Sequence, residues 1–348
     1  MTSSTAVRIE RSLVPPPSYR HLAALSDELG LFEHAKFDRP RREHGYCVDD
    51  VARGLLVGVR EPEPSPELVR LTEIYLRFIE ASTAPNGKLH NRRNVEGRWT
   101  DEPGVGDWWG RALWGLGAAA VHAPLMLTRK RALRAFLALA TQRSPHPRAM
   151  VFAAIGAGEL MLGGNRDERV HSLLRDGLAR IPERSPSWDW PESRLRYGNG
   201  SVAEAMILGG AALGDPLLVD RGVRALHALV RIESRPGHFS VTGTDGRGPS
   251  DEGPQFDQQP IELAAIADAA ARARAVTGDP RWEETIEVAW AWFVGGNDAD
   301  VMMVDLGTGA GYDGLHRHGR NENRGAESTL AALATQQHAR RIELAAHR

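Results

Sequence analysis

The chain contains a single cysteine, Cys47, among its 348 residues, so it forms no internal disulfide bond and offers no cysteine cage for a metal. It has only three lysines, and its formal net charge is -2. Because nucleic-acid-binding proteins usually carry a basic excess, we expect no nucleic-acid partner. The chain has no apolar run of membrane-spanning length and no apolar core of a secretory signal near its start. We therefore expect a cytoplasmic protein without membrane association.

The signatures of several enzyme classes are also missing. The sequence has no G-x-S-x-G nucleophile elbow, no Walker phosphate loop and no H-E-x-x-H zinc motif. The glycine-rich stretch 307–311 follows no clear strand, so it is not typical of a dinucleotide site. The pair His316 and His318 is more typical of a polar loop than of a metal site. We expect neither a metal nor a cofactor.

Helical periodicity runs along almost the whole chain. Apolar residues recur with the helical period in segment after segment, and turn residues separate the segments. The pattern predicts twelve helices, over residues 18–30, 47–60, 65–83, 107–121, 127–142, 147–162, 167–180, 198–213, 215–232, 257–277, 280–294 and 324–342. Only 239–242 and 302–305 favour short strands.

The predicted helices are of two kinds that roughly alternate. Segments 107–121 and 198–213 are apolar on nearly every side, as helices buried all round are, whereas 127–142 carries arginines on one face. An inner ring of buried helices inside an outer ring produces this alternation. We therefore predict an all-α fold, an (α/α)6 toroid, as one catalytic domain over 18–348 after a flexible segment 1–17. A two-domain helical protein and an open helical solenoid are the alternatives.

Long polar connections precede buried helices. The stretches 84–106, 181–197, 233–256 and 295–323 each lead into a buried helix, and the connections after buried helices are short. Long loops gathered at one end of a scaffold are where binding and catalysis usually occur. We expect the functional site at that end of the ring.

Five buried helices begin with similar chemistry: a carboxylate, an amide or aromatic neighbour, and a long loop before them. Helix capping explains each of these carboxylates when it is taken alone, because acids are favoured in the first turn. Together, at one end of a ring, we expect them to line a single acidic, aromatic cleft. The candidate catalytic acids, which the sequence does not rank, are Asp49, Asp50, Asp107, Glu192, Asp257 and Glu327.

Aromatic, amide and arginine side chains accompany these acids and suit a sugar ligand. Aromatic rings pack on the C–H faces of sugars, amides both donate and accept hydrogen bonds, and arginines bind an anionic sugar or orient the acids. The neighbours Trp108 and Trp109 point about 100° apart on a helix, so at least one is expected to face a cavity or loop. The candidate binding residues are Tyr46, Arg53, Trp108, Arg111, Trp190, Asn199, Gln258, Gln259, Tyr312, Asp313, Asn321 and Asn323.

Such a cleft points to glycosidic cleavage. Two carboxyl groups must flank the bond, one protonated and one ionised, and crowding of acids raises the pKa of one of them. A separation of about 5–5.5 Å between the carboxyl groups gives retention, and one of about 6.5–9.5 Å gives inversion. We expect the larger separation, and therefore an inverting glycoside hydrolase, in a helical ring.

The motifs also resemble those of a known family. The chain is similar to a bacterial family of (α/α)6 domains, often labelled as glycosyltransferases because the domain can be fused to one. This resemblance covers residues 18 to 342 and rests on the motifs HGYCVDD at 44–50, GRALW at 110–114, DQQP at 257–260, YDGL at 312–315 and NRGAEST at 323–329. It implies a six-hairpin glycosidase-like fold and an oligosaccharide or polysaccharide substrate, without implying a particular reaction.

One position departs from the family pattern. The family usually reads Asp-Asp-Asn-Ala-Arg, whereas here Val51 replaces the asparagine, and Asp49, Asp50 and Arg53 stay in register. If that amide contacts sugar in the relatives, specificity differs in this chain. No glycosyltransferase half is present in this sequence, so we do not expect transfer from a nucleotide sugar.

Other functions stay open on the sequence alone. A sugar epimerase or isomerase shares the helical toroid but uses histidines as acid and base, for which His44 and His316 are the candidates. A non-catalytic glycan-binding module would tolerate the loss of any single acid. A lyase acting on uronic acids would release an unsaturated product. The oligomeric state is not indicated.

Overall fold

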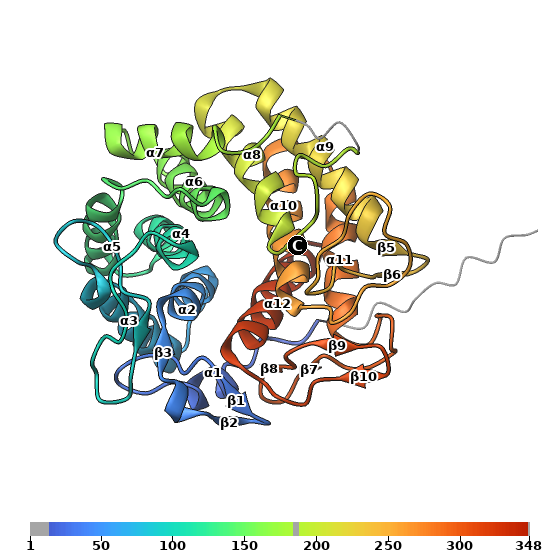
Figure 1. Cartoon of the computed structure of the whole chain (residues 1–348), viewed down its shortest axis with the longest axis horizontal. Coiled ribbons are helices and arrows are strands. Elements are labelled where there is room, and N and C mark those ends of the chain that lie inside the picture. Colours follow the sequence, from blue (N-terminus) through green and yellow to red (C-terminus); the bar gives the residue numbers. More distant parts are fainter. Residues whose placement is uncertain (1–13, 184–187, 347–348) are drawn as a thin grey trace, which may run out of the picture.

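The computed structural model describes residues 14–183 and 188–346. Residues 1–13, most of the segment expected to be flexible, lie outside this range. The described part contains twelve α-helices (Figure 1): α1 (Arg20–Ala24), α2 (Val48–Arg60), α3 (Pro66–Ser82), α4 (Asp107–His122), α5 (Met126–Leu139), α6 (Pro147–Leu162), α7 (Glu168–Leu178), α8 (Asn199–Leu213), α9 (Pro216–Glu233), α10 (Pro260–Thr277), α11 (Arg281–Phe293) and α12 (Ala326–Ala346).

The helices form two concentric rings. Helices α2, α4, α6, α8, α10 and α12 each pack against the next, and α12 packs against α2, so the inner ring closes (Figure 1). Helices α3, α5, α7, α9 and α11 each pack outside the inner helix that precedes them, and α1 lies against α12 and α3. The predicted (α/α)6 toroid is confirmed.

The first helix is much shorter than predicted, because α1 ends at Ala24 whereas the pattern extended to residue 30. Two side chains compete for the backbone there: Ser26 Oγ donates to the Leu22 carbonyl at 2.8 Å, and Asp27 Oδ1 accepts from Leu29 N at 2.9 Å. Such local hydrogen bonds offer the backbone an alternative to the helix. The apolar spacing that suggested a longer helix comes from loop residues packed into the core, such as Leu31.

Small residues let the inner helices approach one another closely. A Cβ built on Gly156 of α6 would lie 2.2 Å from the carbonyl oxygen of Leu113 on α4, and one on Gly117 of α4 would lie 2.3 Å from the carbonyl oxygen of Gly156. A Cβ on Gly200 of α8 would meet the carbonyl oxygen of Ala265 on α10 at 2.2 Å. These glycines therefore set the diameter of the ring.

Five antiparallel pairs of two-residue strands lie in the described connections; four of them are hairpins, and the pair of β3 with β4 joins two connections that α2 and α3 separate in the chain. Two of them partly match the short strands predicted over 239–242 and 302–305. The pairs are β1 (Ala35–Lys36) with β2 (Arg39–Pro40), β3 (Tyr46–Cys47) with β4 (Arg92–Arg93), β5 (Ser234–Arg235) with β6 (His238–Phe239), β7 (Val304–Asp305) with β8 (Ala310–Gly311), and β9 (Leu315–His316) with β10 (Gly319–Arg320).

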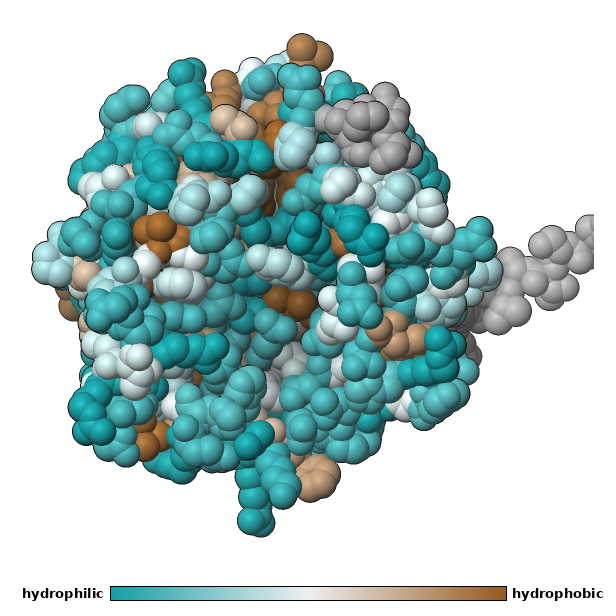
Figure 2. Space-filling view, in the orientation of Figure 1, coloured by the Kyte–Doolittle hydropathy of each residue, from teal (hydrophilic) through white to brown (hydrophobic). Residues whose placement is uncertain are grey.

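The long connections precede inner helices as predicted, and the connections after inner helices are short. The surface in the same orientation is mostly hydrophilic, with hydrophobic residues showing in patches that include one near the middle of the ring (Figure 2). Among the described helices, none combines the length and the apolar character needed to cross a membrane.

Candidate active site

Two adjoining cavities lie where the inner helices begin. We call the first the acidic cavity; its volume is about 520 Å³, and it is lined by Glu33, His34, Cys47, Asp49, Asp50, Arg53, Asn91, Arg92, Asp107, Trp108, Gln259, Asp313, Asn321, Gly325, Glu327 and Ser328. The second, the arginine-lined cavity, has about 450 Å³ and is lined by Arg111, Arg194, Leu195, Arg196, Tyr197, Thr242, Gly243, Thr244, Asp245, Gly246, Gln259, Ile261, Glu262 and Glu327. Gln259 and Glu327 line both, so the cavities form one cleft.

Arg53 of α2 joins three carboxylates at the centre of this cleft. Its Nη2 lies 2.6 Å from Asp49 Oδ2 and 2.7 Å from Asp50 Oδ1, and its Nη1 lies 2.5 Å from Glu327 Oε2. Burial disfavours the charged guanidinium, but Asp49, Glu327 and Asp50 outweigh burial and raise the pKa of Arg53 well above its usual value. We call these four residues the Arg53 cluster.

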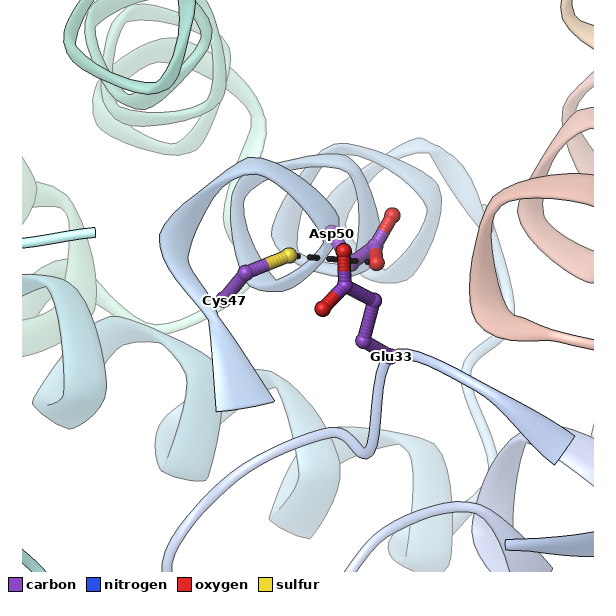
Figure 3. Close-up of side chains that lie close together, drawn as sticks. All are labelled: Glu33, Cys47 and Asp50. Carbon is purple, nitrogen blue, oxygen red and sulfur yellow. Dashed lines mark hydrogen bonds between the residues drawn. The ribbon is translucent and has the colours of Figure 1, made fainter. Parts of the chain in front are cut away.

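Asp50 is the most deeply buried acid of the Arg53 cluster, with 2% of its surface exposed. Burial raises the pKa of Asp50 to about 6; Arg53 opposes the rise, and the negative charges of Glu327 and Asp49 add to it. The thiol of Cys47 donates a hydrogen bond to Asp50 Oδ2 at 3.2 Å, and Glu33 lies beside both residues (Figure 3). Asp50 therefore takes up a proton at a much higher pH than an exposed aspartate does.

Asp107 is the first residue of α4, with Gly106 as the N-cap. It accepts a hydrogen bond from the Tyr197 hydroxyl, and burial together with Asp107 raises the pKa of that phenol. One turn further along α4, Arg111 Nε lies 3.1 Å from Asp49 Oδ1, and its guanidinium stacks on Phe152 with 4.1 Å to the ring centroid. Arg111 thus connects the Arg53 cluster to the helix that carries Asp107.

The start of α12 is held by Asp313. Its Oδ1 accepts a hydrogen bond from Gly325 N at 2.6 Å and another from the Ser328 hydroxyl. These two contacts order the first turn of α12, which carries Glu327 into the cleft. Asp313 is therefore placed to position Glu327 as well as to line the acidic cavity.

A third, narrower space continues from the cleft along the ring axis. We call it the apolar shaft; it has about 40 Å³ and is lined by Arg53, Leu56, Val57, Arg111, Trp114, Gly198, Ser201, Ile261, Ala264, Ala265, Asp268, Glu327, Leu330, Ala331 and Ala334. It shares Arg53, Arg111, Ile261 and Glu327 with the cavities above. Most of its lining residues are apolar, in contrast to those of the cleft.

Among the described residues, two groups of side chains come close enough to hold a cation. Asp49, Asp50 and Glu327 have oxygens within 4.8 Å of one another, but the guanidinium of Arg53 lies among them. In the second group, Glu33, Cys47 and Asp50, the Cys47 thiol donates a hydrogen bond to Asp50 at 3.2 Å. The first group is therefore already neutralised by a cation of the protein, and the thiol of the second is engaged with Asp50.

Ten of the predicted site residues line the cleft: Asp49, Asp50, Arg53, Asp107, Trp108, Arg111, Gln259, Asp313, Asn321 and Glu327. The adjacent Trp108 and Trp109 point in different directions, as helix geometry requires. Trp109 is fully buried in the core, and Trp108 lines the acidic cavity while its Nε1 donates to the Leu89 carbonyl at 3.0 Å.

The other predicted residues lie outside the lining of the three spaces, and several are bound within the scaffold. Tyr46 is fully buried and donates to Asp27 Oδ2 at 2.7 Å. Gln258 is also fully buried and donates to Asp298 Oδ2 at 2.6 Å. Asn199 Nδ2 donates to Glu262 Oε2 at 2.9 Å, which ties the start of α8 to α10.

The loop that carries Trp190, between α7 and α8, is also bound to the scaffold. Trp190 is fully buried, and its Nε1 donates to Glu192 Oε2 at 3.4 Å. Glu192 in turn forms an ion pair with Arg148 of α6 at 2.9 Å. These contacts fasten the loop to the body of the protein and hold Trp190 and Glu192 away from the cleft.

Of the last three predicted residues, Tyr312 and Asn323 come from the loops around β8 to β10, and Asp257 comes from the loop before α10. Asp257 forms a 2.6 Å pair with His316 Nδ1, and the two side chains are about half exposed. Tyr312 lies under the guanidinium of Arg320, 3.6 Å from its ring centroid. Asn323 Oδ1 accepts from the backbone N–H of Phe37 at 2.9 Å.

Several cleft residues were not singled out from the sequence. Glu33 and His34 come from the connection before α2, where the sequence shows no periodic pattern to follow. Asn91 and Arg92 come from the loop before α4, and Arg196 from the loop before α8. The general rule that long loops precede buried helices pointed to these segments, but it did not identify the residues that face inward.

No family model and no curated protein matches the chain. Solved structures do match. A sugar epimerase from a ruminal bacterium has a TM-score of 0.73 at 13% identity, with 94% of this chain and 97% of that chain covered. A GH76 α-mannanase from Bacteroides thetaiotaomicron has a TM-score of 0.64 at 10% identity, covering 94% and 95%.

A third similar structure is an inactive α-1,6-mannanase variant from Salegentibacter, with two adjacent aspartates replaced by alanine, in complex with a mannotetraose. Its TM-score is 0.63 at 10% identity, covering 93% of this chain and 96% of that chain. At such identities the likeness establishes the fold. The same toroid thus carries both sugar epimerases and glycoside hydrolases.

Proposed function

We propose that this protein is a glycoside hydrolase that cleaves a bacterial glycan or an oligosaccharide derived from one. The observation that carries the proposal is the Arg53 cluster, which places three carboxylates at the mouth of the ring. Among them Asp50 has a pKa raised to about 6, mainly by burial. Carboxyl groups whose environments separate their pKa values are what acid–base cleavage of a glycoside requires.

The catalytic roles of the acids depend on which two carboxylates leave room for a sugar between them. Asp49, Asp50 and Glu327 have oxygens within 4.8 Å of one another and share one guanidinium, which fills the space between them. Cleavage of a glycosidic bond therefore requires one acid of the Arg53 cluster and one acid outside it. We assign Asp50 as the proton donor and Asp107 as the base that activates water.

We infer an inverting reaction from the position of Asp107. Asp107 lies at the start of α4, one helical turn before Arg111, so a second inner helix carries it, outside the group of acids that share Arg53. A pair of acids from α2 and α4 with a water between them matches the larger carboxyl separation of inverting enzymes. In this assignment Trp108 supplies an aromatic surface beside the base, and Gln259 hydrogen-bonds to sugar hydroxyls.

The adjacency of two aspartates is a further support. The mannanase variant named above is inactive with two neighbouring aspartates replaced, and this chain places the neighbours Asp49 and Asp50 in the same cleft. The parallel favours a hydrolase that depends on an aspartate pair.

The test is a screen of the purified protein against defined oligosaccharides and bacterial glycans, with products read by mass spectrometry. Asp50→Asn, Asp107→Asn and Glu327→Gln run alongside the parent protein, with Asp257→Asn as a matched control outside the cleft. We expect sugar release that the first three variants lose and the control keeps. If the protein bound sugars but changed the mass of none of them, the proposed hydrolase function would be wrong.

A second function, sugar epimerisation, is favoured by one observation. His34 lines the acidic cavity, with its ring centroid 5.1 Å from that of His44. Burial and the neighbouring His44 lower the pKa of His34, so a neutral imidazole is available as a base. Proton exchange at a sugar carbon, followed by NMR in D₂O and abolished by His34→Ala, would identify this reaction instead.

A further inference from the structure

The apolar shaft differs in chemistry from the cleft above it. Its upper end is formed by Arg53, Arg111 and Glu327, which also line the two cavities, so it opens directly below the proposed cleavage site. Below them most of its wall consists of apolar side chains such as Leu56, Val57 and Leu330. A group entering from the cleft therefore leaves a polar environment for an apolar one.

Small side chains keep the shaft open. Ala264 of α10 and Ala331 and Ala334 of α12 line it, although they lie deep in the inner ring. Each keeps a small exposed fraction, of 8%, 4% and 7% respectively. A leucine at any of these positions would add the volume of about three carbon atoms to a space of 40 Å³.

The acid at the inner end of the shaft, Asp268, already has polar partners within the protein. Asp268, the acid at this end, is already bound by Arg60 at 2.5 Å and by His338 at 2.6 Å. An apolar cavity stays dry unless a water finds two or more polar partners. Between the Arg53 cluster and Asp268 the polar groups of the lining are the Ser201 hydroxyl and the indole N–H of Trp114, and the other side chains there are apolar.

The size of the shaft limits what enters it. Since a water-sized group needs about 10–15 Å³ of cavity volume, the 40 Å³ of the shaft hold about three such groups. A sugar ring is too large, but a methyl or a short alkyl substituent on a sugar fits. The shaft therefore selects for a substituent and leaves the ring itself in the cleft.

We infer that the apolar shaft is a binding site for a methyl-sized apolar substituent of the sugar held at the Arg53 cluster. The methyl of a 6-deoxy sugar, an O-methyl group and the methyl of an acetyl group share the required chemistry. The inference rests on the proposed function only for the nature of the ligand that carries the methyl, because the affinity of the shaft for small apolar groups is independent of any reaction.

The first experiment uses xenon as a probe and needs no sugar. Methyl-labelled protein is titrated with xenon under pressure and followed by ¹H–¹³C NMR. We expect saturable shifts at Val57, Ile261 and Leu330 that vanish in Ala331→Leu, because the added side chain fills the shaft. Ala345→Leu, an exposed position on the same helix, is the matched control and keeps the shifts. An absence of saturable shifts in the parent protein would overturn the inference.

The second experiment measures sugar binding by calorimetry, using matched pairs of sugars with and without the methyl in three arms: 6-deoxy against 6-hydroxy, O-methyl against hydroxyl, and N-acetyl against N-formyl. We expect a preference of about fourfold or more for the methyl in at least one arm, the gain from burying one such group. The preference should disappear in Ala331→Leu and persist in Ala345→Leu.

Thermal unfolding of both variants checks that they are folded. Equal affinity within all three pairs, or a preference that Ala331→Leu leaves intact, would overturn the inference. Because binding is measured, a protein that prefers the methyl sugar but releases no product would contradict the proposed function and leave this inference standing.

Discussion

Arg53 is the residue on which the cleft depends most directly, because one guanidinium neutralises carboxylates from both α2 and α12. Replacing it with leucine leaves Asp50 buried without its main counter-charge. Removing one partner of a buried ion pair typically costs roughly 3–5 kcal/mol, and we expect Arg53→Leu to lose stability of that order in urea unfolding.

The matched control is Arg169→Leu, which breaks an exposed pair with Asp167 on the surface. Exposed pairs contribute little to stability because solvent screens them, so this variant should unfold almost like the parent protein. Equal effects of the two substitutions would show that Arg53 does not organise the site.

The raised pKa of Asp50 predicts a specific pH dependence. A proton donor with a pKa of about 6 loses its proton as the pH rises, so kcat/KM should fall above about pH 6. The Cys47 thiol lowers the pKa of Asp50 through its hydrogen bond, so Cys47→Ala should move this limb to higher pH. A limb that stays in place in Cys47→Ala would assign the titration to another group.

The same group affects stability with a definite sign. Because the pKa of Asp50 is about 6 in the folded protein, against 3.8 for an aspartate of the unfolded chain, the folded protein binds the additional proton between these values. Its contribution to the free energy of unfolding therefore falls as the pH rises from about 4 to about 6. Asp50→Asn should flatten this part of the stability profile.

The sequence identified which kinds of residue occur at the helix starts but not which of two neighbours faces the cleft. Gln258 is held in the scaffold by Asp298, whereas Gln259 lines both cavities. Tyr46 lies in a short strand whose side chains are buried, so its ring packs in the core. A shift of one residue decides between core and cavity, and an irregular loop carries no period that would define it.

At the scale of the elements, the close approach of α4 and α6 is the feature most open to test. In Gly156→Ala the new Cβ would lie 2.2 Å from a backbone oxygen of α4, where no flexible side chain can give way. Alanine adds up to about 1 kcal/mol of helix propensity, but overpacking costs about 1–3 kcal/mol. We therefore expect a net loss of stability in chemical denaturation.

Gly307→Ala is the control for that substitution. Gly307 is exposed, and its new Cβ would meet only the side chain of Asp305, at 3.3 Å. We expect a change within about 0.5 kcal/mol, as for other surface substitutions. A stable Gly156→Ala variant would mean that the inner ring can widen at this seam.

The element pattern was well predicted because it follows from hydrophobic periodicity. All twelve predicted segments contain a helix. The errors occur where local hydrogen bonds override the pattern, as in α1. Most of the two-residue strands were not predicted, since pairs of residues in a loop are too short to show the alternation of a strand.

At the scale of the whole molecule, a second polar cluster holds the lower half of the ring together. It draws on all six inner helices, through Arg60, His122, Glu159, Glu204, Asp268, Arg272 and His338. Burial raises the pKa of Glu204 to about 8, and the charge of Asp268 adds to the rise. Glu204 is therefore largely protonated at neutral pH and sits among charged neighbours.

This cluster predicts that stability declines as the pH rises from weakly acidic to slightly above neutral. Since the pKa of Glu204 is about 8 in the folded protein, against 4.5 for a glutamate of the unfolded chain, its contribution to the free energy of unfolding falls as the pH rises from about 4.5 to about 8. Glu204→Gln should reduce that slope in urea unfolding. Part of it should remain, because burial and Glu262 raise the pKa of Glu233 to about 8 as well.

The exposed Glu168 on α7 is the matched control for the slope. Glu168→Gln should leave the pH profile of stability unchanged. If Glu204→Gln behaved like this control, the buried carboxyl would be charged in the folded protein and the cluster would need a different account.

The ring as a whole was predictable from the alternation of buried and amphipathic helices, and with it the end at which the long connections and the cleft lie. The two-cavity division of the cleft and the apolar shaft were not. They depend on how side chains from helices distant in sequence, such as α2 and α10, meet at the axis. One sequence carries no direct signal of those distances.

The most direct test of the central claim is to run the reaction in H₂¹⁸O with a glycan that the protein releases sugar from. The account predicts one ¹⁸O at the new reducing end, a first-formed anomer opposite in configuration to the substrate, and no product from Asp50→Asn. Incorporation of ¹⁸O into a product with the anomeric configuration of the substrate would agree with hydrolysis but contradict the pairing of Asp50 with Asp107. A product without ¹⁸O and with unchanged mass would contradict hydrolysis itself.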